Sequence, residues 1–262
     1  MIPEDFHVHS SYSDGLDHPE TVVRAALALG MTYLGFSDHG YAAYDGECCI
    51  PREKLAEHRQ TIRALSEKYR DRIEICCGVE QDLYSDAPTE GYDYVIGSVH
   101  YLYLDGRYYD IDYKVETLRE LTERFFGGDV YGLTAAYFQA VGEVYERTGC
   151  DLIGHFDLIC KLNERYSLFD PQHPRYIEAW QKAAERLLKS GKPFEINTGG
   201  ISRGYTTAAY PALDIRRYLA DRGARFVLSS DSHSADTLLY GFAREEALAG
   251  EMGIPLTRFR WK

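Results

Sequence analysis

Short apolar runs recur along the chain and are separated by longer stretches with helical periodicity. Each run spans four to six residues and is rich in β-branched or aromatic side chains. Runs of this length are typical of strands that are buried on both faces of a parallel sheet. The seven predicted strands are Asp5–His9, Tyr33–Ser37, Glu74–Val79, Tyr94–Val99, Asp151–Gly154, Pro193–Asn197 and Arg225–Ser229.

Helical patterns fill the intervals between these strands. The predicted helices are Pro19–Leu29, Arg52–Tyr69, Val115–Phe126, Leu133–Thr148, Pro174–Ser190, Pro211–Arg222 and Ala235–Glu251. Asp17 is the expected N-cap of the first helix, and Gly30 lies where its last turn should end. Regular alternation of strand and helix predicts an α/β fold whose parallel sheet is either open or closed into a barrel.

The composition is that of an ordinary globular protein. The 262 residues are 45% hydrophobic and 27% charged, and this length fits a single barrel domain spanning residues 1–262. No apolar stretch approaches the roughly 20 residues that cross a bilayer. The N-terminus lacks the basic flank and apolar core of a secretory signal. We therefore expect a cytoplasmic protein that does not bind membranes.

Charge and cysteine content narrow the choice of partners. Lys and Arg number 29 against 41 Asp and Glu, so the formal net charge is -12 and the surface should repel nucleic acid. A local basic pocket for one small phosphate remains compatible with this charge. The six cysteines form no CxxC motif, which favours reduced thiols that mostly fill the core.

Metal-ligand residue types follow most of the predicted strands. They are His7, His9, His39, Glu80, His100, His155, Asp231 and His233. In a closed parallel barrel the carboxyl ends of the strands converge on one face, so these side chains should meet there. Imidazoles and carboxylates without thiolates suit zinc, iron or manganese, and the set is large enough for two or three ions. The other histidines, His18, His58 and His173, are expected at helix starts or helix surfaces.

The motifs that carry these residues resemble those of the PHP (polymerase and histidinol phosphatase) superfamily, specifically its monofunctional histidinol-phosphatase branch. The matching segments are FHVHSSYSDG, GFSDHG, GVEQDL, SVHYL, IGHFDLICK, EINTGG and SSDSH followed by YGF, and they run in order from residue 6 to residue 242. The resemblance implies a distorted (β/α)7 barrel of PHP type, which agrees with the seven predicted strands.

The same resemblance implies a site with two or three divalent metal ions. One ion would be bound by His7, His9, Glu80 and Asp231, a second by Glu80, His100 and His155, and a third by Asp14, His39 and His233. Glu80, Asp231 and His233 are the implied catalytic residues, and a hydroxide bridging two metals would be the nucleophile. Asp14 is also a good turn residue, because Ser13-Asp14-Gly15 favours a turn. The general acid for the leaving group is left open between a metal-bound water and Asp231.

A phosphate ester would need local cations on this acidic chain. Lys161 and Arg203 lie in family-like segments and are the predicted phosphate-binding residues; a solvated charge is the alternative for each. The loops Gly40–Pro51, Tyr101–Tyr113 and Gly199–Tyr210 are rich in tyrosine and could form walls for a small organic group.

The expected activity is hydrolysis of L-histidinol phosphate in histidine biosynthesis. A PHP-type phosphoesterase for a nucleotide, a phosphodiester or phosphotyrosine is the first alternative. A non-catalytic PHP module and an amidohydrolase-like barrel are the others. The module should have lost ligands, whereas this chain keeps every expected ligand position, and no carbamylated lysine is evident at a strand end.

Overall fold

The strands of this computed structural model, which describes residues 3–260, form two parallel sheets and one hairpin. The first sheet has the order β1-β2-β3, with β1 Glu4–Asp5, β2 Tyr33–Phe36 and β3 Glu74–Cys77. The second has the order β10-β9-β8-β5-β4, with β4 Val79–Asp82, β5 Val95–Ser98, β8 Leu152–Ile153, β9 Phe194–Asn197 and β10 Phe226–Ser229.

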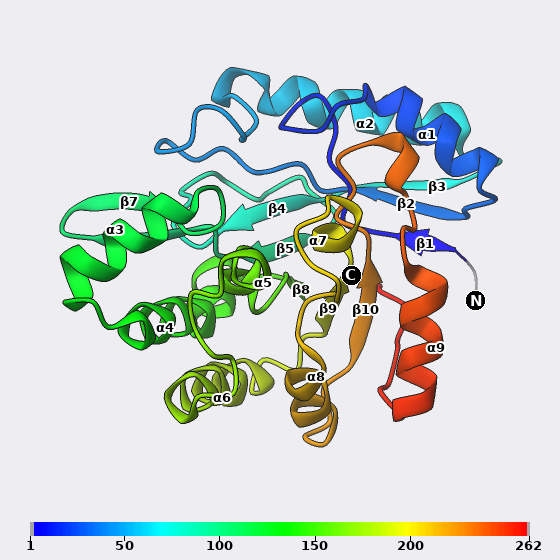
Figure 1. Cartoon of the computed structure of the whole chain (residues 1–262). Helices are drawn as coiled ribbons and strands as arrows, with labels where there is room; N and C mark the ends of the chain where they lie inside the picture. The colour runs from blue at the N-terminus through cyan, green and yellow to red at the C-terminus, as the bar shows by residue number, and fades with distance from the viewer. Residues whose placement is uncertain (1–2, 261–262) are drawn as a thin grey trace.

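The two sheets join at both ends and close a ring (Figure 1). On one side β3 runs into β4 with only Gly78 between them. On the other side Val8 pairs with Ser232, where the His9 amide donates to the Ser232 carbonyl at 2.8 Å. Counting β3 and β4 as one position gives seven positions, so the predicted distorted (β/α)7 barrel is confirmed. The closing contact lies beyond β1, at the carboxyl ends of the strands.

Seven helices of eight residues or more connect these strands within residues 3–260. They are α1 Pro19–Ala28, α2 Leu55–Tyr69, α3 Val115–Phe126, α4 Val130–Thr148, α6 Pro174–Leu188, α8 Leu213–Ala220 and α9 Phe242–Met252. Shorter helical turns are η1 Arg52–Lys54, η2 Leu158–Cys160, α5 Asn163–Tyr166, α7 Gly199–Ser202 and η3 Ala235–Thr237. None of the helices in the described part of the chain has both the length and the apolarity needed to cross a lipid bilayer.

Three local predictions were wrong. The N-cap of α1 is His18, whose Nδ1 accepts from the Glu20 amide; the Asp17 carboxylate instead accepts from the Ala235 amide at 2.8 Å. The helix predicted from Ala235 is interrupted before α9, because Leu239 and Gly241 have positive φ angles. The predicted loop from Tyr101 contains the hairpin β6 Tyr101–Leu104 and β7 Arg107–Asp110, which turns at Asp105-Gly106, a dipeptide typical of hairpin turns.

Tyr94 fills the interior of the ring at the end opposite the predicted metal ligands. Its hydroxyl donates to the Phe6 carbonyl at 2.6 Å, and its ring packs against Phe6 and Phe259. A Cβ on Gly35 or Gly78 would come within 2.2 Å of the Tyr94 side chain, so these two positions require glycine. All six cysteines are free thiols, and Cys76, Cys77 and Cys150 are among the buried residues. The barrel is therefore a packed core, with polar side chains concentrated at the carboxyl ends of its strands.

Candidate metal centre

Glu80 on β4 lies at the middle of the predicted ligands and is almost completely buried. Its Oε2 is 3.2 Å from His7 Nε2 and 3.0 Å from His39 Nδ1. Its Oε1 is 2.8 Å from His155 Nε2 and 3.5 Å from His100 Nε2. The two oxygens of one carboxylate thus face different groups of imidazoles, which is the arrangement of a carboxylate that bridges two metal ions.

Asp231 follows β10 and completes this inner group. Its Oδ1 is 3.2 Å from His9 Nε2 and 3.6 Å from His7 Nε2. Asp231 has a φ of 49°, an uncommon value for a residue other than glycine and one that occurs at functional sites. A Cβ on Gly199 would approach the Asp231 side chain to 2.8 Å, so glycine lets α7 pack directly against it. We call the following residues the inner cluster: His7, Glu80, His100, His155 and Asp231.

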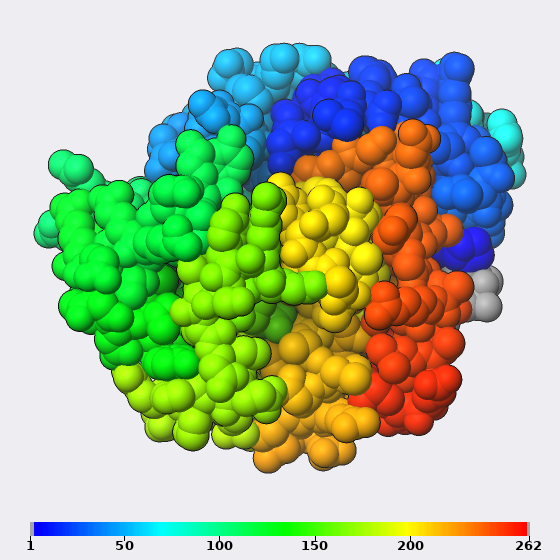
Figure 2. Space-filling model, in the orientation of Figure 1, coloured from blue at the N-terminus to red at the C-terminus, as the bar shows by residue number. Residues whose placement is uncertain are grey.

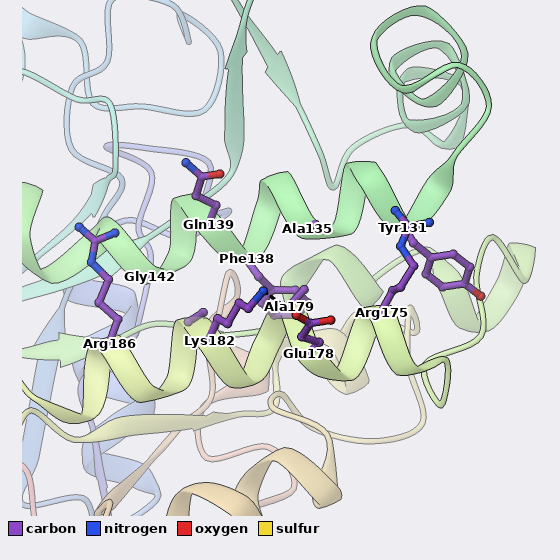
Figure 3. Close-up of a pocket in the computed structure, with 11 residues that line it drawn as sticks. Tyr131, Ala135, Phe138, Gln139, Gly142, Arg175, Glu178, Ala179, Lys182 and Arg186 are labelled. Carbon is purple, nitrogen blue, oxygen red and sulfur yellow. Dashed lines mark ion pairs between the residues drawn. The ribbon is translucent and has the colours of Figure 1, made fainter.

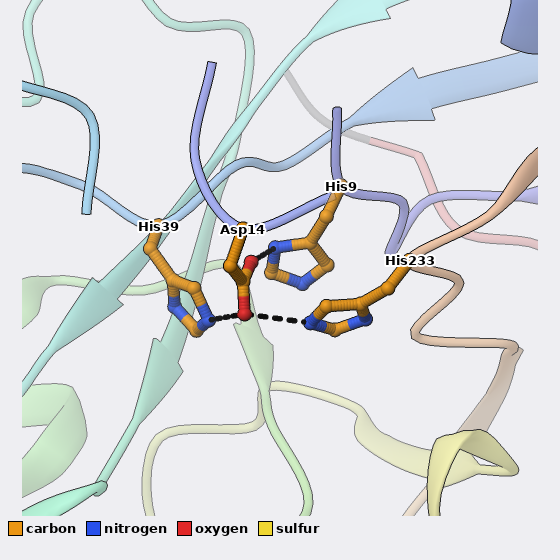
Figure 4. Close-up of side chains that lie close together, drawn as sticks. All are labelled: His9, Asp14, His39 and His233. Atoms are coloured by element: carbon orange, nitrogen blue, oxygen red, sulfur yellow. Dashed lines mark hydrogen bonds and ion pairs between the residues drawn. The ribbon is translucent and has the colours of Figure 1, made fainter. Parts of the chain in front are cut away.

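A second group, the outer cluster, consists of His9, Asp14, His39 and His233, whose potential ligand atoms all lie within 4.8 Å of one another. Asp14 is central to it (Figure 4). Its Oδ1 is 3.4 Å from His9 Nδ1, and its Oδ2 is 3.1 Å from His233 Nε2 and 3.8 Å from His39 Nε2. The structure therefore brings together all nine predicted ligands, which come from segments more than 200 residues apart in sequence.

Several of the ligand atoms are buried without a hydrogen-bond partner. Among the described residues they are His7 Nε2, His9 Nδ1, His9 Nε2, Asp14 Oδ1, Glu80 Oε2 and His155 Nδ1. An unpaired buried polar atom costs free energy, and here such atoms from neighbouring side chains point toward shared positions. A divalent cation would satisfy several of them at once. The donor set of imidazole nitrogens and carboxylate oxygens fits zinc, iron or manganese.

The electrostatics of the site keep its acids ionised and differ from one histidine to the next. Burial favours the neutral acid at Glu80, but the surrounding imidazoles outweigh it and hold the pKa of Glu80 well below its usual range. At Asp231 the burial is outweighed first by the Arg203 guanidinium, and the pKa of Asp231 is again far below its usual value. Burial lowers the pKa of His233 to about 4, and the positive charges of His9 and Arg203 contribute to this shift. Both acids are thus ionised and His233 is neutral at neutral pH. Burial opposes the charged form at His39, but Glu80 and Asp14 outweigh it and raise the pKa of His39 to about 10, so a cation bound there would displace a proton.

The PHP domain family matches residues 5–199, well over half of the chain. The chain belongs to the PHP family. Asp231 and His233 lie beyond the matched range, yet the structure places both beside ligands within it.

Relatives of this PHP protein place it in the histidinol-phosphatase branch. A Deinococcus radiodurans protein named probable histidinol-phosphatase is 32% identical over 253 residues, which cover 91% of this chain and 89% of the relative. The histidinol-phosphatase of Bacillus subtilis is 21% identical over 92% of this chain and 97% of its own length. The crystal structure of histidinol phosphate phosphatase from Lactococcus lactis, complexed with zinc, L-histidinol and phosphate, has a TM-score of 0.75 at 21% identity and covers 97% of this chain and 95% of that chain. This last likeness establishes the shared fold.

The two predicted phosphate-binding residues of the PHP protein differ in placement. Arg203, which caps α7, lies between the clusters: its Nη2 is 3.1 Å from Asp231 Oδ2 and its Nη1 is 3.1 Å from His233 Nε2. Lys161 pairs with Asp112 at 2.6 Å and lies over the Tyr205 ring. On the face shown in Figure 2, the segment around α7 lies between the segment after β8, which carries Lys161, and the segment after β10. A phosphate-binding role for either residue stays a prediction.

Glu195 on β9 is a buried acid that the sequence analysis missed. Its Oε1 is 2.6 Å from His7 Nδ1, and its Oε2 accepts from the His155 amide at 3.0 Å and from Asn197 Nδ2 at 3.1 Å. This contact fixes the His7 ring so that Nε2 faces Glu80, as carboxylates commonly do for metal-bound histidines. The available signal, an acid two residues before Asn197 in the same strand, is also typical of half-exposed strands. Asn197 Oδ1 also accepts from the amide of Gly199, the first residue of α7, at 2.9 Å, so Asn197 links the site to that helix.

Tyrosines from two segments of this PHP protein gather beside His100. The ring of Tyr44 stacks on Tyr108 of β7 with centroids 4.0 Å apart and meets Tyr101 of β6 at 4.9 Å. The Tyr44 hydroxyl donates to Asp82 Oδ1 at 2.5 Å, and Asp82 Oδ2 accepts from the His100 amide at 2.8 Å. The aromatic group is therefore linked to a predicted metal ligand through one carboxylate, while its role as a substrate wall stays a prediction.

A surface groove between α4 and α6 contains none of the residues of either cluster (Figure 3). The three cations that line it are already paired: Arg175 with Asp129, Lys182 with Glu178, and Arg186 with Glu146. Gly142 of α4 lies against α6, where a Cβ would make ordinary contact with the Ala183 backbone at 3.4 Å. The groove therefore offers no unpaired charge for a phosphate.

The three histidines expected outside the site fall into two classes. His18 and His173 cap α1 and α6, as predicted for helix starts, and each accepts through Nδ1 from an amide two residues ahead. The prediction for His58 was wrong, because it lies on α2 but is completely buried.

Proposed function

We propose that this protein is a metal-dependent phosphomonoesterase that hydrolyses L-histidinol phosphate to L-histidinol and phosphate in histidine biosynthesis. The observation that carries the proposal is the position of Glu80, whose two oxygens face separate groups of imidazoles in one buried centre. Relatives that span nearly the whole chain bear the name histidinol-phosphatase, which supports the choice of substrate.

Two or three divalent ions of zinc, iron or manganese would be held by the chain's own ligands. His7, His9, Glu80 and Asp231 would hold one ion, Glu80 with His100 and His155 a second, and Asp14 with His39 and His233 a third. When bound, such ions activate water near neutral pH and offset the negative charge of a phosphoryl group. Glu80, Asp231 and His233 thereby act as the catalytic residues, because they hold the reacting groups in place.

Cationic side chains near the clusters would orient the phosphate. Arg203 presents its guanidinium at the junction of the two clusters, where it also neutralises Asp231. A guanidinium can bind a phosphate with two parallel hydrogen bonds, so Arg203 would fix the orientation of the ester. Lys161 would contribute a second positive charge from the neighbouring segment. Because Arg203 keeps Asp231 ionised, Asp231 carries no proton to donate to the leaving group.

The decisive experiment measures phosphate release from L-histidinol phosphate and metal content on the same purified sample. We expect turnover that depends on the bound metal and that exceeds turnover of a nucleoside monophosphate, phosphotyrosine and a phosphodiester. A fully metallated sample that ignores histidinol phosphate and hydrolyses one of the other esters would move the assignment to another PHP phosphoesterase. A fully metallated sample inactive on all of them would contradict the enzymatic proposal.

A further inference from the structure

His58 occupies a position that simple packing does not explain. It lies on the buried face of α2, its Nε2 is 3.0 Å from Asp38 Oδ2, and its Nδ1 has no hydrogen-bond partner among the described residues. The Tyr12 ring meets it edge-on with centroids 5.2 Å apart. Burying an imidazole with one unsatisfied nitrogen costs free energy that an apolar residue would avoid. A role for the remaining nitrogen, which contacts Asp38, would account for that cost.

Asp38 is a fully buried carboxylate that holds the loop between two predicted metal ligands. Its Oδ1 accepts from the Ser10 amide and from Ser13 Oγ, each at 2.7 Å. Ser10 Oγ lies within 3.0 Å of both Asp38 oxygens. Ser10 follows His9 and Ser13 precedes Asp14, so this single carboxylate fixes the two ends of the short loop that carries both ligands.

The same carboxylate is adjacent in sequence to a third ligand. Asp38 immediately precedes His39, so its own position determines where the His39 backbone lies. Three of the four outer-cluster residues, His9, Asp14 and His39, are thus one residue away from a group in the Asp38 network. The fourth, His233, is held separately, because its carbonyl accepts from the Leu16 amide at 2.8 Å.

We propose that His58, acting through Asp38, is a positioning residue for the cation site of the outer cluster. His58 donates from α2 to a carboxylate that already accepts from Ser10 and Ser13, and it holds that carboxylate in the orientation both serines need. The inner cluster has a different support, because Glu195 contacts His7 and His155 from β9. Loss of His58 should therefore weaken the ion of Asp14, His39 and His233 most, because His9, which also serves the inner ion, is held in addition by its amide bond to the Ser232 carbonyl.

The test compares His58→Phe with His58→Gln in the full-length protein. Phenylalanine fills the space but cannot donate, whereas the glutamine amide can place a donor near the position of Nε2. Each chelator-stripped variant is titrated with Zn²⁺ in competition with a chelator of known affinity. We expect His58→Phe to weaken by about 10- to 100-fold the ion that is also lost in Asp14→Ala, which identifies it as the outer-cluster ion, and His58→Gln to restore most of that affinity.

A matched control separates positioning from general destabilisation. Ile62 lies on the same helix and is completely buried, so Ile62→Ala should lower the melting temperature without changing Zn²⁺ affinity. Ser13→Ala removes one hydrogen bond to Asp38 without changing α2. It should weaken the same ion by a smaller factor than His58→Phe does. It therefore reports on the network even if His58→Phe does not fold.

This inference rests on the metal centre of the proposed function, and the outcomes distinguish the two. A wild-type protein that binds no Zn²⁺ would contradict the centre itself. Wild-type binding at every site in both His58→Phe and Ser13→Ala would overturn only the positioning role. Equal weakening of the outer ion by Ile62→Ala would also overturn it, because any loss of helix packing would then suffice.

Discussion

The inner and outer clusters are neighbours, yet the chain supports them differently. Inner-cluster ligands lie within or just after strands, and Glu80, His7 and His155 are at most 2% exposed. In the outer cluster His9 is buried, but the side chains of Asp14, His39 and His233 are 27%, 16% and 14% exposed; in the inner cluster His100 is the more exposed member, at 14%. Strand ends are fixed by the sheet, whereas the loop carrying Asp14 depends on side-chain hydrogen bonds. The difference suggests that the protein builds a rigid inner pair of sites and a separately adjustable outer one.

The largest loss of activity should follow substitution of Glu80, because its two oxygens face two separate groups of imidazoles in the inner cluster. Glu80→Gln leaves the shape intact but removes the charge shared by His7 and His155. We expect kcat to fall by more than about 10³-fold, beyond the loss of a single charge-stabilising donor, together with loss of inner-cluster metal. Steady-state kinetics and elemental analysis of the same sample would check this. Wild-type kcat in a fully folded variant would contradict the bridging role.

Asp14→Ala tests whether the outer cluster can lose its ion while the inner cluster keeps its own. Asp14 contacts only outer-cluster histidines, so its removal should release one ion and leave the inner ions bound. We expect activity to fall by about 10²-fold, because one charge-stabilising group is lost from the site. Metal analysis after gel filtration distinguishes the outcomes. If the inner ions leave as well, the two clusters are one cooperative unit and the comparison above is wrong.

The strand ends made much of this site predictable from sequence, because parallel strands in a closed barrel bring their carboxyl ends to one face. His7, Glu80 and His155 were therefore identifiable without coordinates. Glu195 was missed because its alternation with Phe194 and Ile196 is typical of ordinary half-exposed strands, and its partner His7 is 188 residues away. His58 was misassigned for a related reason: only the tertiary contact with Asp38 explains why a histidine is buried on that face of α2.

Arg203 contacts both clusters, so its replacement asks whether they act on one phosphate. Arg203→Met removes charged hydrogen bonds, which are each worth about 1.5–3 kcal/mol, so KM for histidinol phosphate should rise by about 10- to 100-fold. The matched control is Arg175→Met, which removes an exposed arginine of the groove between α4 and α6. Initial-rate kinetics would separate KM from kcat. An unchanged KM in Arg203→Met would rule out phosphate binding by this side chain.

The smallest expected effect is a loss of inner-cluster Zn²⁺ affinity when Glu195, which contacts His7, is substituted. Glu195→Gln keeps an oxygen that can accept from His7 Nδ1 but removes the negative charge, so the inner Zn²⁺ affinity should fall by about tenfold, the lower end of the range for groups that orient a metal ligand. The matched control is Glu245→Gln, which disturbs the buried pair of Glu245 with Arg216 and should lower stability without changing Zn²⁺ affinity. Competition with a chelator measures the affinity, and thermal unfolding measures the stability. If Glu195→Gln weakened Zn²⁺ binding only at the outer cluster, the proposal that Glu195 supports the inner cluster would be wrong.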